Sequence, residues 1–174
     1  MSFRYQARYC EENVWHLCQE PMFANRDPHA VIVSNAQRGV PVWHQRAGVE
    51  GEPVVWDYHV VLLARALAAW EVWDLDTTLG LPVAAAEYAD RALAAGKLAQ
   101  PWVQWCRVVA AERFVATFTS DRSHMRTPEG EWLAPPPPWD PIGNGVSNLW
   151  DFVDMNSQVA GTVLSATEFR NRYA

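Results

Sequence analysis

Three side chains that act together in thiol-dependent acyl transfer occur at widely separated points of this 174-residue chain. Cys10 stands directly before two acids, His59 lies inside an apolar run, and Asp74 lies near the end of the next such run. A cysteine thiolate attacks an amide or ester carbonyl when a histidine takes the thiol proton and a carboxylate orients the ring. The chain therefore carries a candidate Cys-His-Asp triad, with Cys10 as nucleophile, His59 as base and Asp74 as orienting acid.

Each of these residues also has an ordinary structural explanation. Cys10 can be an inert thiol, His59 a hydrogen-bonded core histidine, and Asp74 the cap of a turn. Asp57 and Asp76 flank the candidate site by strand parity, and either can instead be solvated or bonded to backbone. The order of the three residues, with histidine and acid on paired strands, favours the triad.

The apolar spacing that follows Cys10 predicts a helix that ends before Pro21, with Cys18 on its buried face. Cys10 then lies at or just before the helix N-terminus, where the helix dipole favours a thiolate. The two acids that follow Cys10 oppose this effect by like charge. A histidine partner is therefore expected to matter more for thiol activation than the helix end does.

Residues 54–63 form the clearest predicted strand, and residues 70–76 form its expected antiparallel partner. Both faces of the first strand are mostly apolar, which is typical of a central strand covered on both sides. Strand alternation points Trp56 and Tyr58 away from His59.

The expected turn between these strands fixes which residues oppose one another. A turn that pairs Arg65 with Ala68 places His59 directly opposite Asp74, with Cβ atoms roughly 5 Å apart. The turn contains no glycine or asparagine, so a one-residue bulge would shift this register.

Apolar patterns and turn residues predict the remaining elements. We expect strands at 30–34, 40–43, 107–110 and 162–164, and helices at 83–100, 112–118, 149–153 and 165–173, the last one opened by a capping box. Residues 127–145, which contain four consecutive prolines, are expected to form a surface loop. The prediction is one α+β domain over residues 1–174, with a mostly antiparallel central sheet and helices on both sides.

The composition argues against several classes of protein. The net charge is −6 and Lys97 is the only lysine, so the clustered basic surface of a nucleic-acid-binding protein is absent from the sequence. No apolar run approaches the length that spans a bilayer, and no secretory signal is visible, so we expect a cytoplasmic protein without a membrane partner. Three cysteines without a CxxC pair argue against a disulfide framework and against a structural zinc site.

Two further features leave alternatives open. The ten tryptophans can be core residues, or some of them can line an aromatic groove. The polar segment 120–125 can be a helix cap with its loop, or the wall of a pocket.

Five short strings together point to a known family. They are CEEN at 10–13, WDYHV at 56–60, DLDT at 74–77, SDRSHM at 120–125 and PPPP at 135–138. In this order they closely resemble the protein N-terminal glutamine amidohydrolase family, also called the WDYHV-motif proteins. The resemblance covers residues 9–173.

The resemblance implies an enzyme that converts the N-terminal glutamine of a protein or peptide to glutamate and releases ammonia. It also implies a fold like the papain and transglutaminase core, and it assigns the nucleophile to Cys10, the base to His59 and the orienting acid to Asp74. It implies no metal or organic cofactor. The expected partners are proteins or peptides with a free N-terminal glutamine, acted on by a monomer whose product can feed an N-degron pathway.

Such an enzyme must bind a free α-ammonium group, and a buried cation requires a paired acid or carbonyl oxygens. The candidates are Glu12, Asp57 and Asp121, with Ser123 as a further substrate-binding residue. The alternatives are another thiol acyl-transfer enzyme of the transglutaminase or peptidase type, and a non-catalytic peptide-binding module.

Overall fold

The computed structural model describes residues 3–67 and 69–174. Its centre is a six-stranded sheet in the order β6-β5-β4-β1-β7-β8, in which every neighbouring pair is antiparallel. The strands are β1 (His29–Ser34), β4 (His59–Ala66), β5 (Ala69–Trp73), β6 (Val83–Ala84), β7 (Trp105–Ala110) and β8 (Thr162–Ser165). A separate two-stranded sheet pairs β2 (Val40–Val42) with β3 (Val54–Trp56).

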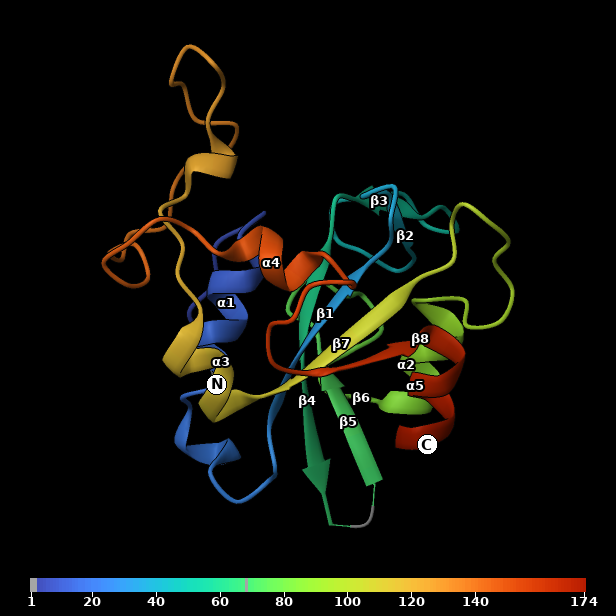
Figure 1. The fold of residues 1–174 in the computed structure, drawn as a ribbon. Coiled ribbons are helices and arrows are strands. Elements are labelled where there is room, and N and C mark those ends of the chain that lie inside the picture. Colours follow the sequence, from blue (N-terminus) through green and yellow to red (C-terminus); the bar gives the residue numbers. More distant parts are fainter. Residues whose placement is uncertain (1–2, 68) are drawn as a thin grey trace.

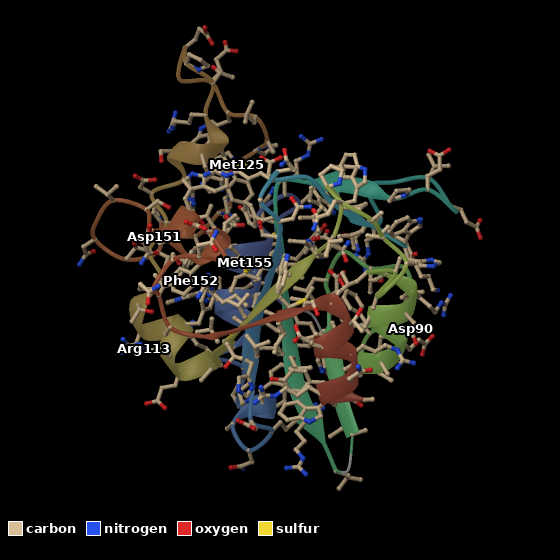
Figure 2. The ribbon with its side chains drawn as sticks, turned by 45° about the vertical axis from the view of Figure 1, so that its right-hand side comes forward. Asp90, Arg113, Met125, Asp151, Phe152 and Met155 are labelled. Atoms are coloured by element: carbon tan, nitrogen blue, oxygen red, sulfur yellow. The ribbon has the colours of Figure 1, made fainter. Side chains whose placement is uncertain are left out.

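Helices cover both faces of the central sheet (Figure 1). One face carries α1 (Cys10–Leu17), α3 (Ala111–Thr117) and α4 (Leu149–Val153), and the other carries α2 (Ala85–Arg91) and α5 (Ala166–Tyr173). Short 3-10 helices lie at Pro21–Phe23 and Ser123–Met125. Figure 2 shows Arg113 on α3 and Asp90 on α2 at opposite sides of the sheet. The predicted α+β class, with helices on both sides of an antiparallel sheet, is confirmed.

Successive side chains of β4 point to opposite faces of the sheet and contribute to the hydrophobic core on each face. Val60 and Leu62 pack with α1, α3 and α4, whereas Val61 and Leu63 pack with α2 and α5. β4 is therefore covered on both faces, as its unbroken apolar sequence predicts. His59, its first residue, lies at the end of this buried strand and is 2 % exposed.

Two predicted elements are shorter than expected. The predicted strand 54–63 is interrupted at Asp57 and Tyr58, because β3 pairs with β2 outside the central sheet. The predicted helix 83–100 is present only as α2, after which Ala94 and Gly96 adopt positive φ angles that interrupt helical backbone. The capping box of α5 is confirmed, since the Ser165 hydroxyl accepts from the backbone N–H three residues on.

The predicted register of the β4–β5 hairpin is wrong by two residues. Arg65 lies opposite Trp70, not Ala68, and the ladder ends where Leu62 meets Trp73. Ala68 itself lies outside the described residues. Because the error is an even number of residues, every side chain keeps its predicted face of the sheet.

A long segment between α3 and α4 leaves the body of the molecule and returns to it (Figure 1). Figure 2 places Met125 at the base of this excursion, above α4. The segment is anchored by Arg122, whose guanidinium donates to both oxygens of Glu12 at 2.8 Å and to the carbonyl oxygen of Trp139. No helix among the described residues is long and apolar enough to cross a membrane.

Candidate active site

One cleft contains both Cys10 and His59. It encloses about 390 Å³ and is lined from α1, from the β3–β4 connection and from the excursion between α3 and α4. Its other lining residues are Arg8, Ala47, Val54, Val55, Trp56, Asp57, Tyr58, Asp76, His124, Met125, Leu133 and Trp150. The predicted nucleophile and base therefore share one solvent-connected space, although they are 49 positions apart in the chain.

Cys10 is the first residue of α1, as the sequence predicts, and it is partly exposed. Burial raises the pKa of the Cys10 thiol well above its ordinary value, and the charges of Glu11, Asp76 and Asp74 raise it further. A backbone hydrogen bond from Val60, the residue after His59, acts in the opposite direction on this pKa. This environment therefore favours the protonated thiol, and a base beside the sulfur is needed to promote its ionisation.

His59 and Asp74 form a buried pair. The Nε2 atom of His59 lies 3.0 Å from Oδ1 of Asp74, and their side chains are 2 % and 1 % exposed. Burial lowers the pKa of His59, but the charge and hydrogen bond of Asp74, with the charge of Asp76, outweigh it, so the pKa is raised. Because Nε2 is held by the carboxylate, Nδ1 is the ring nitrogen left to face the cleft.

Four donors surround the Asp74 carboxylate. Oδ2 accepts from the Gln45 amide at 3.0 Å and from the Tyr88 hydroxyl at 2.9 Å, while Oδ1 accepts from the Asp76 N–H at 2.9 Å as well as facing His59. Burial raises the pKa of Asp74, but its ion pair with His59 and these hydrogen bonds outweigh burial and lower it. Asp74 is thus held ionised in the interior.

The contact between His59 and Asp74 arises differently from the prediction. In the observed register Asp74 lies beyond the last paired residue of β5, at the start of a turn. The two side chains share one sheet face and meet diagonally, and the Asp76 N–H bond shows that Asp74 also caps its own turn. Asp74 is therefore a turn cap, and the same carboxylate makes the contact with His59 that an orienting acid would make.

Trp56 lies against the His59 ring, contrary to the predicted strand alternation. The two rings are stacked, with centroids 6.1 Å apart and planes 13° apart. The alternation fails because the strand is interrupted at Asp57 and Tyr58. The indole N–H of Trp56 donates to Gln45 at 3.3 Å, so the same amide that holds Asp74 also holds this aromatic wall.

A second buried polar cluster lies beside the thiol. Glu11 is fully buried, its Oε2 accepts from the Tyr58 hydroxyl at 2.9 Å, and its Oε1 lies 3.3 Å from Nε2 of His124. The Cys10 sulfur lies 3.7 Å from Glu11 Oε2. Tyr58 and His124 both line the cleft, so this cluster forms its wall on the α1 side.

Comparison with known proteins agrees with the geometry. The family model described as N-terminal glutamine amidase matches residues 5–173. The chain belongs to this family. The chain is 37% identical to the protein N-terminal glutamine amidohydrolase of Homo sapiens over 178 residues, which cover 97% of this chain and 87% of that protein. It is also similar to the proteins of the same name from Danio rerio, at 37% identity over 95% of this chain and 86% of that protein, and from Drosophila melanogaster, at 38% over 95% and 85%.

In this member of the amidase family, only one of the predicted substrate-binding residues lines the cleft. Glu12 does not line the cleft, because its carboxylate is fully buried and bound by Arg122 and the Trp139 indole. Asp121 and Ser123 are exposed, bond to each other and also lie outside the cleft lining. Of the three acids first considered, only Asp57 faces the cleft.

Asp76, noted in the sequence as a flanking acid, does line the amidase cleft and accepts from the Tyr5 hydroxyl at 2.5 Å. Burial raises the pKa of Asp76, and its hydrogen bond with Tyr5 only partly offsets this effect. In segment 120–125, His124 and Met125 line the cleft, which supports the pocket-wall interpretation for these two residues. Across the described residues, no group of three or more His, Cys, Asp or Glu side chains is arranged to hold a metal ion.

Sequence reasoning missed the residues that support this site from a distance. Gln45 and Tyr88 bind Asp74 from a loop and from α2, and no local pattern marks them for that role. Glu11 was considered only as a like charge near the thiol, and its pairing with His124 spans more than a hundred residues of sequence.

Proposed function

We propose that this protein hydrolyses the side-chain amide of an N-terminal glutamine in proteins or peptides and releases ammonia and N-terminal glutamate. The observation that carries the proposal is that Cys10 and His59 line one cleft while Asp74 holds Nε2 of His59 at 3.0 Å. The names of its relatives point to the same reaction. A cytoplasmic monomer that feeds an N-degron pathway stays a prediction.

The first half of the reaction forms a thioester. Nδ1 of His59 takes the thiol proton, and the Cys10 sulfur attacks the γ-carboxamide carbon of the glutamine. The carbon–nitrogen bond breaks as His59 returns the proton to the departing nitrogen, which leaves as ammonia. The enzyme then carries a γ-glutamyl group on Cys10.

The second half releases glutamate. A water molecule gives a proton to His59 and adds its oxygen to the thioester carbon, and the carbon–sulfur bond breaks. The sulfur recovers its proton from His59, and the product has a carboxyl group where the substrate had an amide. Asp74 keeps Nδ1 as the reacting nitrogen in both halves and stabilises the imidazolium.

The start of α1 supplies donors for the developing oxyanion. The first N–H groups of a helix have no intrahelical acceptor, and Cys10 is the first residue of α1. These N–H groups point out of the N-terminal end of α1, where Cys10 lies, and can donate to the oxyanion of the tetrahedral intermediate.

Two acids of the cleft are suited to the α-ammonium group of the substrate. Asp57 is exposed at the cleft surface and Asp76 is deeper, near the His59–Asp74 pair. Replacing glutamine by asparagine withdraws the carbonyl by about one methylene, and a misplacement of this size costs on the order of 100-fold in rate. Acetylation of the substrate removes the cation and is expected to abolish binding at these acids.

Ammonia release from a glutamine-started peptide tests the proposal. Cys10→Ala is expected to abolish release, whereas Cys18→Ala, a change of the same kind outside the cleft, is expected to preserve it. Peptide cleavage or cross-linking to an amine, in place of ammonia release, would identify the peptidase or transglutaminase alternative. Tight peptide binding without turnover would identify a binding module.

A further inference from the structure

We infer that the free edge of β3 binds the main chain of the substrate just beyond its N-terminal glutamine, as an added β-strand. The inference rests on the proposed function and assigns the part of the substrate that follows the reacting residue. Its occupant is the second or third residue of the substrate polypeptide, held through its backbone N–H and C=O groups.

The pairing of β2 with β3 determines which backbone groups of β3 are free. Pro41 lies opposite Val55 in this ladder. Because proline has no N–H, this pair cannot exchange hydrogen bonds, and the bonded pairs lie on either side of it. The N–H and C=O groups of Val55 therefore point away from β2, towards the unpaired edge of β3. Among the described residues, no turn or loop hydrogen bond uses these two groups.

The free edge lies in the cleft itself. Val54, Val55 and Trp56 line the same space as Cys10 and His59. β3 leads through two residues into His59, and Trp56 stacks on the His59 ring. A chain whose first side chain reaches the sulfur must leave the cleft along one of its walls, and β3 is a wall that presents a main-chain donor and acceptor directed away from their own sheet.

Exposed apolar side chains line the cleft beside its acids. Val55 is 54% exposed, and Leu133, which also lines the cleft, is 53% exposed. Main-chain hydrogen bonds to Val55 do not distinguish between substrate side chains, since every residue except proline offers the same backbone N–H and C=O. The enzyme is therefore expected to accept many residues after the glutamine, and to disfavour proline at the position opposite Val55.

Substrates with one ester bond test the inference without altering the enzyme. A glutamine-started hexapeptide is compared with versions in which an ester oxygen replaces the backbone N–H of the second, third or sixth residue. We expect kcat/KM to fall about 2- to 10-fold, mainly through KM, for the second or the third residue, the range that one neutral hydrogen bond gives. The ester at the sixth residue is expected to leave kcat/KM unchanged.

A variant tests the same contact from the enzyme side. Val55→Pro removes the N–H that β3 offers, and the measurement is the ratio of kcat/KM for the hexapeptide to that for glutamine N-methylamide. We expect this ratio to fall towards one in Val55→Pro and to keep its wild-type value in Val49→Pro, an equivalent change at an exposed loop position.

Equal kcat/KM for all ester peptides would overturn the inference, and this result is available even when Val55→Pro does not fold. A wild-type ratio in folded Val55→Pro would overturn it as well. Absence of ammonia release from the unmodified peptide is a different result, because it contradicts the proposed function and not the role of β3.

Discussion

Replacing Asp74 by asparagine separates the charge of this residue from its shape. The side-chain amide can keep its oxygen towards His59 and the Asp76 N–H, and turn its NH2 group towards Gln45 and Tyr88. The Tyr88 hydroxyl can rotate to accept, and the Gln45 amide can turn to do so. Turning Gln45 gives up its bond to the Trp56 indole. The variant is therefore expected to fold, with a loss of about 1–3 kcal/mol in the free energy of unfolding.

The effect on activity is expected to be larger than the effect on stability. In the proposed mechanism both steps pass through a protonated His59, and Asp74 supplies the opposite charge 3.0 Å from Nε2. With charge centres about 4 Å apart and an effective dielectric constant of about 20, this attraction is worth about 4 kcal/mol. The expected fall in kcat/KM is then about 1000-fold, since each 1.36 kcal/mol is about tenfold.

Ammonia release from a glutamine-started peptide, measured across pH, gives the result. The matched control is Asp90→Asn, the same chemical change on α2, where the acid pairs with Arg170 at the surface. This control is expected to keep wild-type activity. A folded Asp74→Asn protein whose kcat/KM lies within about threefold of the wild-type value would refute the role given to the carboxylate. A tenfold fall corresponds to about 1.4 kcal/mol, so a threefold fall is far smaller than the attraction of about 4 kcal/mol worked out above.

Three further predictions follow from buried charges and thiols. Arg122→Met leaves the fully buried Glu12 carboxylate without its cation and is expected to lower the free energy of unfolding, measured by chemical denaturation, by about 3–5 kcal/mol. Adding Glu12→Gln is expected to restore part of this loss, and an unchanged denaturation midpoint in Arg122→Met would contradict the importance of the buried pair. Iodoacetamide at pH 8 is expected to label Cys10 faster than Cys18 in the native protein, because Cys10 lines the cleft that also holds His59 as a base and Cys18 lies outside it; mass spectrometry of the labelled peptides decides. The raised pKa of His59 contributes stability that is fully present below about pH 6.5 and is lost as the pH rises through the raised value, so the melting temperature is expected to fall over that interval in wild type and not in His59→Gln.

The sequence predicted the positions of Cys10 and His59 because each depends on a strong local pattern. Apolar residues at helical spacing begin at Val14, one turn after Cys10, and an apolar run surrounds His59. The pairing with Asp74 was predicted from a wrong register, and it held because an error of two residues preserves the face of a strand. An error of one residue would have separated the two side chains.

Long-range partners could not be predicted in the same way. The sequence offers Glu12 as a candidate because a buried substrate cation needs a paired acid, but Arg122, 110 positions away, already pairs with its carboxylate. The stacking of Trp56 on His59 depends on the strand interruption, which has no glycine or proline to mark it. In both cases the decisive partner is brought in by tertiary structure.

The carboxylates around the cleft act on the two reacting groups in opposite ways. Asp74 and Asp76 raise the pKa of His59 and also that of the Cys10 thiol, so they favour a protonated ring beside a protonated sulfur. A protonated ring cannot accept the thiol proton, so these charges oppose formation of the thiolate. A cation that enters near Asp76 lowers both pKa values by its charge. The α-ammonium of the proposed substrate is such a cation and lies on the same residue as the amide. We therefore expect its binding near Asp76 to favour the thiolate, and an acetylated terminus to lack both the contact and this charge.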